Sequence, residues 1–365
     1  MLVTIAARHN EEMPSKLVPG DRIAVLSPSF AAPAVAPVLH EQALRRLTEL
    51  TGLVPVEYPT TRQLGASPEA RAADINAAYA DPSIRAILAT IGGDDQILVI
   101  AHLDAALAQA DPKPFVGYSD NTNIHNWLWQ QGIQGFYGGS TAVHLGPGPA
   151  VDEIHLRSLR AALLDGGELE LTEPGESEDV GRRWEDSRAL VEYGDRRPTE
   201  PWTWAGPERR VEGPTWGGCL EVLDGVAFAD RLPAASDLDG AILILETSEE
   251  RPPAAWVARW LRGLGERGIL AAAAGVIFAR PPVSDFDFHP SAEEAQTLRE
   301  AQRDAVIETV ARYNPDAVVC IGVPFGHTRP QWIVPYGGRI ALDGVRRTVT
   351  ADYSSTAAAK PRSSS

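Results

Sequence analysis

A serine placed between an apolar run and a helical segment has the clearest chemical potential in this sequence. Residues 115–122 read Phe-Val-Gly-Tyr-Ser-Asp-Asn-Thr, with Ser119 at the turn. A serine hydroxyl in such a turn projects above the sheet, and the next backbone N–H, that of Asp120, points toward a developing oxyanion. The alternative is that Ser119 only caps the helix, a role that Asp120, Asn121 or Thr122 can also fill. Because Asn121 replaces the second glycine of a Gly-x-Ser-x-Gly turn, the local pattern alone favours capping.

A second turn has the sequence Ile-Gly-Gly-Asp-Asp at residues 91–95. Its two glycines let the backbone approach a ligand closely, so the N–H of Gly93 can supply a second oxyanion donor beside Asp120. An ordinary turn after a strand is the alternative. The segment has neither the glycine spacing of a dinucleotide loop nor the lysine of a P-loop.

A serine nucleophile also needs a base, and the sequence offers eight histidines. His327 follows the apolar run 317–323 through the turn Pro-Phe-Gly, which places it at the end of a strand. His144 and His289, which are flanked by glycine and proline, stay open as alternatives.

Glu246 is the candidate for the acid that orients the base, because it ends the uncharged apolar run 241–245. A carboxylate there is costly to bury unless it is paired, which makes it a site candidate. A surface residue at the point where the strand emerges is an equally good interpretation. Glu249 and Glu250 are interpreted as solvated.

The first half of the chain alternates apolar runs with amphipathic segments. This pattern predicts an α/β fold, a doubly wound, flavodoxin-like parallel sheet whose ligands lie beyond the carboxyl ends of the strands. The expected strands are 22–29, 53–58, 86–91 and 114–118, and the expected helices are 37–50, 68–79, 96–108 and 121–131.

A smaller α/β domain is expected in the second half, with strands at 241–245, 275–279 and 317–323, helices at 253–264 and 292–312, and strand-like segments within 332–343. The predicted boundaries are an N-terminal domain at 17–165, a linker and Trp-rich loop at 166–214, a C-terminal domain at 215–352 and a flexible tail at 353–365.

The composition excludes several classes of protein. The 365 residues are 44% hydrophobic, and the net charge is 33 − 49 = −16, which opposes binding to nucleic acid. No apolar run reaches the length of a membrane helix and the first 16 residues are unlike a signal peptide, so we expect a cytoplasmic protein that does not bind a membrane. Cys219 and Cys320 are interpreted as core residues, and no metal or other cofactor is expected.

Several motifs in a fixed order resemble the cytoplasmic serine carboxypeptidases that include the LD-carboxypeptidases of murein recycling and the microcin C immunity peptidases. The resemblance covers nearly the whole chain. It rests on Pro-Gly-Asp (19–21), Ser-Pro-Ser (27–29), residues 71–81, Gly-Gly-Asp (92–94), Gly-Tyr-Ser-Asp-Asn-Thr (117–122), Trp-Gly-Gly-Cys-Leu (216–220), Leu-Glu-Thr-Ser-Glu-Glu (245–250) and Phe-Gly-His-Thr (325–328).

By this resemblance Ser119 is the nucleophile, His327 its base and Glu246 the acid that orients the base. The mechanism implied is transfer of an acyl group to Ser119 and then to water, with the N–H groups of Gly93 and Asp120 holding the oxyanion. The scheme requires no cofactor.

Four of the nine tryptophans lie between the predicted domains or at their border, at positions 184, 202, 204 and 216. Most of these indoles are expected to anchor a loop. The segment Arg-Trp-Glu-Asp at 183–186 is similar to the microcin immunity branch, in which a loop tryptophan stacks on the adenine of the substrate, and we assign that role to Trp184. Arg329 is a candidate contact for a carboxylate or phosphate, with a solvated surface arginine as the alternative.

Three functions follow. The favoured one is an amidohydrolase that cleaves the amide between a C-terminal aminoacyl group and a modified nucleotide, and so gives resistance to peptidyl-nucleotide or aminoacyl-sulfamoyl adenylate antibiotics. The second is an LD-carboxypeptidase that removes the terminal D-alanine from murein tetrapeptides. The third is a non-catalytic binder of aminoacyl nucleotides. The resemblance also implies a homodimer.

Overall fold

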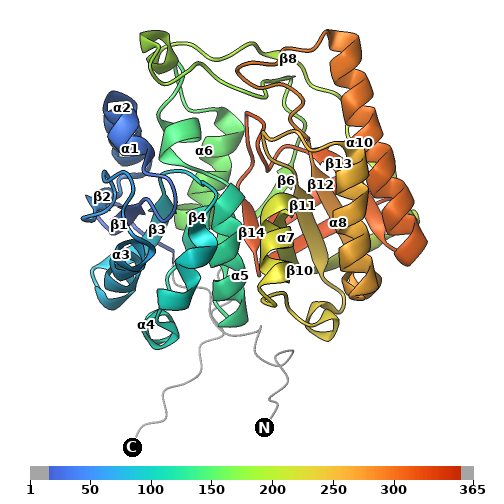
Figure 1. Ribbon diagram of the computed structural model, residues 1–365, viewed down its shortest axis with the longest axis horizontal. Coiled ribbons are helices and arrows are strands. Elements are labelled where there is room, and N and C mark those ends of the chain that lie inside the picture. The colour runs from blue at the N-terminus through green and yellow to red at the C-terminus, as the bar shows by residue number, and fades with distance from the viewer. Residues whose placement is uncertain (1–15, 355–365) are drawn as a thin grey trace, which may run out of the picture.

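The computed structural model describes residues 16–354, which form two α/β halves that pack side by side (Figure 1). Most of the predicted tail, residues 355–365, lies outside the described residues. Tyr353, at the start of that predicted tail, is fully buried, and its hydroxyl donates to the carbonyl oxygen of Ile333.

The N-terminal half is built on a six-stranded sheet with the strand order β14-β5-β4-β3-β1-β2. Strands β1 to β5 pair in parallel in the flavodoxin-like order, which confirms the predicted fold class, and β14 joins the edge antiparallel to β5. The bounds are β1 Arg22–Leu26, β2 Val54–Glu57, β3 Ile84–Ala89, β4 Phe115–Gly117, β5 Gly135–Tyr137 and β14 Val334–Tyr336.

The helices of this half begin and end where local chemistry favours it. Pro37 occupies the first turn of α2, and Gly52 ends that helix with a φ of +74°. Ser67 caps α3 by accepting a hydrogen bond from the N–H of Ala70. The helices are α1 Ala32–Val35, α2 Pro37–Thr51, α3 Pro68–Ala80, α4 Ala105–Ala110, α5 Thr122–Gln130 and α6 Glu153–Arg160.

The predicted helix at 96–108 is wrong. The chain forms two short 3₁₀ turns there, and α4 begins only after Asp104, whose carboxylate accepts from the N–H groups of the first turn. The buried side chain of Gln96 donates to Asn121 Oδ1 and accepts from the N–H of Ile124. These contacts with a distant segment favour the turn over a continuous helix.

The C-terminal half contains an eight-stranded sheet with the order β6-β16-β15-β10-β11-β12-β13-β9, and β7 and β8 form a separate pair. The strands are β6 Glu168–Leu171, β7 Glu176–Ser177, β8 Arg197–Pro198, β9 Thr203–Ala205, β10 Arg210–Cys219, β11 Ile242–Glu246, β12 Gly275–Ala279, β13 Val318–Val323, β15 Arg339–Asp343 and β16 Thr348–Asp352. The helices are α7 Leu220–Phe228, α8 Ala254–Glu266, α9 Ile269–Ala272 and α10 Ala292–Tyr313.

The two halves are interlocked. Strand β14 comes from the second half of the chain but pairs in the first sheet, and β6, in the predicted linker, pairs with β16 in the second sheet. One apolar cluster includes Val116 and Phe136 of the first sheet together with Leu243 and Val276 of the second. The shared core fixes the carboxyl ends of β4 and β11 relative to each other.

In the part of the chain that the structure describes, no helix combines the length and the apolar composition needed to cross a membrane.

Candidate active site

Ser119 lies in the turn between β4 and α5 and has a φ of +66°, a left-handed conformation that residues with side chains rarely adopt. The backbone N–H of Ser119 donates to the hydroxyl of Tyr137 over 3.1 Å, and Asn121 Nδ2 donates to the carbonyl oxygen of Tyr118 over 2.9 Å. A serine held in such a turn presents its hydroxyl away from the sheet. Among the described residues, no side chain makes a capping hydrogen bond to α5, so neither Ser119 nor the other candidates Asp120, Asn121 and Thr122 cap it in this way.

The structure brings Ser119, His327 and Glu246 together from three distant parts of the chain. His327 Nε2 lies 2.9 Å from Ser119 Oγ, and His327 Nδ1 lies 2.6 Å from Glu246 Oε2. Of the three histidines that the sequence left open, His327 is the one that contacts Ser119. His144 lies against Tyr118 in the same region, and His289 lines a different cavity. This arrangement can pass a proton from an alcohol to an imidazole.

Glu246 ends β11 and is fully buried, so the interpretation of this residue as a surface glutamate is wrong. Its Oε1 accepts a hydrogen bond of 2.7 Å from the hydroxyl of Tyr137. A Cβ atom on Gly326 would lie 2.9 Å from the Cβ of Glu246, so glycine is needed there for the segment of His327 to approach β11. The carboxylate is therefore buried and bonded through both oxygens, as a buried charge requires.

His327 is itself buried between carboxylates. Burial disfavours the imidazolium, but the charges of Glu246 and Glu249 outweigh that effect and raise the pKa of His327 to about 9. Burial lowers the pKa of the neighbouring His144 well below its usual range, so this second imidazole stays neutral.

The backbone beside Ser119 is open to an oxyanion. A Cβ atom on Gly92 would lie 2.8 Å from Ser119 Oγ and 3.2 Å from the backbone N of Asp120, so the 91–95 turn approaches the serine closely because it has glycine there. Among the described residues, neither the N–H of Gly93 nor that of Asp120 donates to another group. Unbonded N–H groups next to a serine hydroxyl are the donors that an oxyanion needs.

The side chain of Asp120 has a structural position that the sequence did not indicate. It is buried, and Oδ2 accepts from Ser29 Oγ over 2.6 Å and from the N–H of Gln96 over 2.9 Å. Burial raises the pKa of the Asp120 carboxyl above its usual value. These bonds attach the turn of Ser119 to the loops after β1 and β3.

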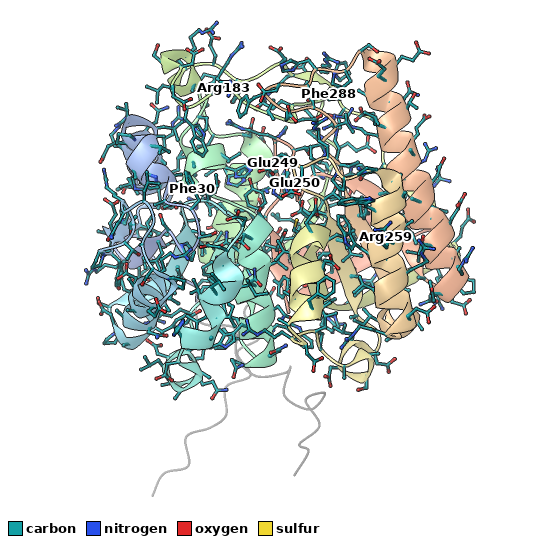
Figure 2. All side chains as sticks on the ribbon, viewed as in Figure 1. Phe30, Arg183, Glu249, Glu250, Arg259 and Phe288 are labelled. Atoms are coloured by element: carbon teal, nitrogen blue, oxygen red, sulfur yellow. The ribbon has the colours of Figure 1, made fainter. Side chains whose placement is uncertain are left out.

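A cavity of about 390 Å³ opens on Ser119 and His327, and Trp184, Phe30 and Glu249 also line it. A second cavity of about 180 Å³ is also lined by Ser119, and it shares Gly93 and Glu249 with the first. Figure 2 shows Glu249 near the region where the two halves of the molecule meet, and Phe30 over the N-terminal half. The larger cavity has the volume of a site for a small organic ligand.

The four tryptophans near the predicted linker have different surroundings. Trp202, Trp204 and Trp216 pack into or against the main apolar cluster. Trp184 is half-buried against Ala36 and Leu39, in a small separate cluster. Trp184 alone of these four lines the cavity of Ser119.

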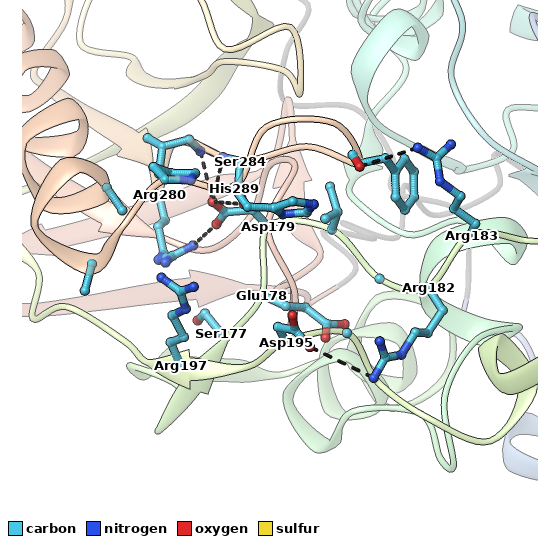
Figure 3. Close-up of a pocket in the computed structure, with 18 of the residues that line it drawn as sticks. Ser177, Glu178, Asp179, Arg182, Arg183, Asp195, Arg197, Arg280, Ser284 and His289 are labelled. Carbon is cyan, nitrogen blue, oxygen red and sulfur yellow. Dashed lines mark hydrogen bonds and ion pairs between the residues drawn. The ribbon is translucent and has the colours of Figure 1, made fainter. Parts of the chain in front are cut away.

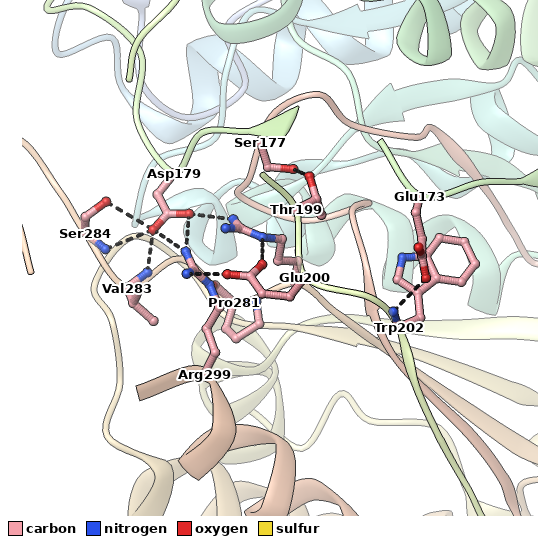
Figure 4. Close-up of polar contacts among 11 residues, drawn as sticks. Glu173, Ser177, Asp179, Thr199, Glu200, Trp202, Pro281, Val283, Ser284 and Arg299 are labelled. Atoms are coloured by element: carbon pink, nitrogen blue, oxygen red, sulfur yellow. Dashed lines mark hydrogen bonds and ion pairs between the residues drawn. The ribbon is translucent and has the colours of Figure 1, made fainter. Parts of the chain in front are cut away.

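The loop that carries Trp184 also borders a wider cavity of about 830 Å³ that is rich in charged side chains (Figure 3). Its anchor is Asp179, which accepts from Arg280 Nη1 over 2.6 Å and from Arg299 Nη2 over 2.8 Å. The same two arginines bond Glu200 at the far end of the loop (Figure 4). Both arms of the loop are thus tied to the C-terminal half.

Arg329 is buried, so the interpretation of it as a solvated surface arginine is wrong. Its Nε donates to Asp152 over 2.8 Å. Its backbone N–H donates to the carbonyl oxygen of Glu178, in the loop that carries Trp184, and its carbonyl oxygen accepts from the N–H of Glu178. Arg329 also lines the cavity of Ser119.

Two groups of site residues were not found from the sequence. Tyr137 lies on β5, a short strand whose aromatic pair between glycines, Gly-Phe-Tyr-Gly-Gly at 135–139, was the available signal. The anchor formed by Asp179, Arg280, Arg299 and Glu200 had no signal, because its members are far apart in a charged sequence. In the described part of the chain, no three His, Cys, Asp or Glu side chains converge in a way that could hold a metal ion.

Comparison with known proteins identifies the family. Residues 23–138 match the model of the LD-carboxypeptidase N-terminal domain, and residues 212–342 match that of the C-terminal domain. The chain belongs to the LD-carboxypeptidase family. It is therefore a serine-type carboxypeptidase, a hydrolase.

Members of the LD-carboxypeptidase family with different names resemble the chain to a similar degree. The microcin C7 self-immunity protein MccF of Escherichia coli is 25% identical over 78% of this chain and 79% of its own. A probable murein peptide carboxypeptidase of Bacillus subtilis is 25% identical over 93% and 94%. The solved structure of MccF in complex with aspartyl sulfamoyl adenosine has a TM-score of 0.79, with 23% identity over 93% of this chain and 98% of that one.

Proposed function

We propose that this carboxypeptidase cleaves the amide between a C-terminal aminoacyl group and a modified nucleotide, and so protects cells against peptidyl-nucleotide or aminoacyl-sulfamoyl adenylate antibiotics. The observation that carries the proposal is one cavity that has the Ser119–His327 pair in one wall and the indole of Trp184 in another. A relative solved with aspartyl sulfamoyl adenosine supports this substrate class.

In the proposed mechanism Ser119 Oγ attacks the amide carbonyl while His327 Nε2 takes its proton. The N–H groups of Gly93 and Asp120 stabilise the oxyanion, and His327 then protonates the leaving nitrogen. Water enters, His327 removes its proton, and the acyl-enzyme is hydrolysed. Glu246 accepts the hydrogen bond of Nδ1–H throughout, which keeps Nε2 directed at Ser119.

Recognition is assigned to the other walls of the cavity. Trp184 stacks on the nucleobase, which is worth about 1–3 kcal/mol for one base. Arg329 contacts a phosphate, sulfamoyl or carboxylate group, and it shares its guanidinium between that group and Asp152.

The test is incubation of the purified protein with aspartyl sulfamoyl adenosine, with chromatographic detection of the released aspartate. The control is Ser119→Ala, which keeps the fold and removes the attacking oxygen. Cleavage by the natural chain and none by the variant is the expected result. An absence of cleavage by the natural chain would rule out the proposed substrate.

The second candidate, an LD-carboxypeptidase of murein tetrapeptides, is supported by the Bacillus subtilis relative, which matches over nearly its whole length. Release of D-alanine from a murein tetrapeptide, measured beside the first assay, separates the two substrates. A non-catalytic binder of aminoacyl nucleotides would instead protect cells equally well with Ser119→Ala.

The proposal includes a cytoplasmic homodimer. Light scattering of the purified protein measures the mass of the assembly, and a value equal to one chain would overturn the dimer. Fractionation of cells that express the chain tests the compartment.

A further inference from the structure

Glu249 is an exposed residue that nevertheless contacts His327 at the centre of the candidate site. Its side chain is 61% exposed, yet its Oε2 lies 3.2 Å from His327 Nε2. This is the same nitrogen that lies 2.9 Å from Ser119 Oγ. Figure 2 shows Glu249 and its neighbour Glu250 near the interface between the two halves.

The two carboxylates on either side of His327 are held very differently. Glu246 is fully buried and is also bonded to Tyr137. Glu249 follows β11 in a loop, and among the described residues its carboxylate has no hydrogen bond or ion pair besides the one with His327. Glu246 is therefore fixed, and Glu249 is free to turn toward solvent.

Both carboxylates favour the charged imidazolium, whereas a base that accepts the proton of Ser119 must be neutral. With its pKa raised to about 9, His327 favours the protonated form at pH 7, which puts a proton on the nitrogen that must receive one. A substrate that displaces a carboxylate from Nε2 lowers this pKa and favours the neutral base.

Glu249 is placed where a substrate must pass. It lines both the cavity of about 390 Å³ that Trp184 also lines and the cavity of about 180 Å³, and Ser119 lines both cavities too. A carbonyl carbon within reach of Ser119 Oγ, with its leaving nitrogen directed at His327 Nε2, occupies the junction of these cavities. That nitrogen and the carboxylate of Glu249 compete for one place.

We propose that Glu249 is a positioning residue that favours the protonated form of His327 in the free enzyme and is displaced from Nε2 when the substrate enters, so that the neutral base forms more readily with substrate in place. This inference rests on the proposed function for the identity of the substrate. Displacement lowers the pKa of His327, so a larger fraction of the imidazolium gives its proton to water, and Nε2 of the neutral ring then accepts the proton of Ser119. The serine is thereby less reactive until an amide occupies the site.

The other groups that face His327 cannot play this part. Glu246 is bonded to Nδ1 and cannot leave without losing its own partners. Glu221, on α7, adds a weaker negative charge and is held by the backbone N–H and the hydroxyl of Ser248. Tyr118 and His144 are both neutral at pH 7, because burial raises the pKa of the first and lowers that of the second.

The first test is an NMR titration of the His327 ring in the natural chain, in Glu249→Gln and in Glu250→Gln. An adjacent opposite charge shifts a pKa by about 1–3 units, and the exposure of Glu249 places the expected fall in Glu249→Gln near the lower end, about one unit. Glu250→Gln is the matched control and should leave the titration unchanged. An unchanged pKa in Glu249→Gln, or an equal fall in Glu250→Gln, would overturn the inference.

The second test separates holding from displacement. The pKa seen on the acid side of the kcat/KM profile belongs to the free enzyme, and the pKa seen on the acid side of the kcat profile belongs to the enzyme–substrate complex. Glu249→Gln should therefore lower the pKa from the kcat/KM profile by about one unit and leave the pKa from the kcat profile unchanged. The same comparison is made by titrating His327 in Ser119→Ala saturated with aspartyl sulfamoyl adenosine. If Glu249→Gln lowers the pKa of bound His327 as much as that of free His327, displacement is wrong. The titration of the free protein needs no activity, so it judges the Glu249 contact even if the proposed substrate fails.

Discussion

The catalytic corner, defined as Ser119, His327, Glu246 and Tyr137, and the tryptophan loop, residues 173–202, face one cavity but are stabilised by different interactions. In the corner, buried hydrogen bonds join one carboxylate to an imidazole and a phenol. The loop is held by ion pairs of Arg280 and Arg299 with Asp179, which is buried, and with Glu200, which is 41% exposed. Substitution in the corner alters the groups nearest Ser119 Oγ, whereas substitution in the ion pairs alters how firmly the loop is held.

The difference separates chemistry from selection of the substrate. Changes in the corner are expected to lower kcat, because in the proposed mechanism its groups hold or move a proton. Changes in the loop are expected to act on stability or on KM, because the loop only supplies walls of the cavity.

The largest effect is expected for Glu246→Gln. An amide cannot stabilise the imidazolium, and it presents the wrong hydrogen-bonding partner to His327 Nδ1, so kcat should fall by about 10⁴. Single-turnover kinetics measure the loss, and Glu308→Gln, a change of the same type on the exposed face of α10, is the control. A rise in KM with kcat intact would place Glu246 with the recognition residues and break the division.

The next largest effect is expected for Asp179→Asn in the tryptophan loop, as a fall in the free energy of unfolding. Asp179→Asn removes the charge between Arg280 and Arg299, which are both largely buried. Breaking a buried pair costs about 3–5 kcal/mol, and we expect the lower value because Glu200 still bonds both arginines. Thermal unfolding measures the change, and kcat should stay within about twofold. Asp186→Asn, which loses an exposed pair with Arg188, is the control and should leave the unfolding temperature nearly unchanged.

The same anchor gives a pH dependence. Burial raises the pKa of Asp179, but the charges of Arg280 and Arg299 outweigh it, so the folded value lies below the unfolded one. Its contribution to stability is complete above the unfolded value of about 3.9 and is lost as the pH falls through the folded value. The unfolding temperatures of the natural chain and Asp179→Asn should therefore converge below about pH 4. A constant difference down to pH 2 would contradict the ion-pair account.

A smaller loss of kcat is expected for Tyr137→Phe. The change removes the donor to Glu246 Oε1 and the acceptor of the Ser119 N–H, and an unsatisfied buried partner costs about 1–3 kcal/mol, or roughly tenfold to hundredfold in rate. Tyr336→Phe is the matched control, since that buried hydroxyl donates to the carbonyl oxygen of Gly217 and not to the corner. Equal losses in the two variants would mean that stability, and not the Glu246 contact, sets the rate.

The corner and the loop also differ in how much of them the sequence predicts. The strand-to-helix alternation and the turn of Ser119 depend on neighbours in sequence, so the flavodoxin-like sheet was predictable. Tyr137 was missed because β5 is only three residues long and its role depends on contacts with β11. The ion pairs of Asp179 join segments about a hundred residues apart, and the same local charges are compatible with many other pairings.

The predicted helix at 96–108 failed for a related reason. Local propensity favours a helix there, but the buried amide of Gln96 bonds to Asn121 and to the N–H of Ile124. Tertiary hydrogen bonds outweigh a propensity worth only tenths of a kcal/mol for each residue. These bonds also hold the turn of Ser119, so the error lies where the fold supports the site.

The smallest effect is expected for Trp184→Phe. A phenyl ring keeps part of the stacking surface, so under about 1 kcal/mol should be lost and KM should rise up to about fivefold with kcat unchanged. Trp202→Phe is the control, because that indole packs against the main core and does not line the cavity. A nucleoside without the aminoacyl group sharpens the result, since its affinity should fall in Trp184→Phe by the same factor. A change in kcat without a change in affinity would assign Trp184 to the catalytic corner and remove the division between the two regions.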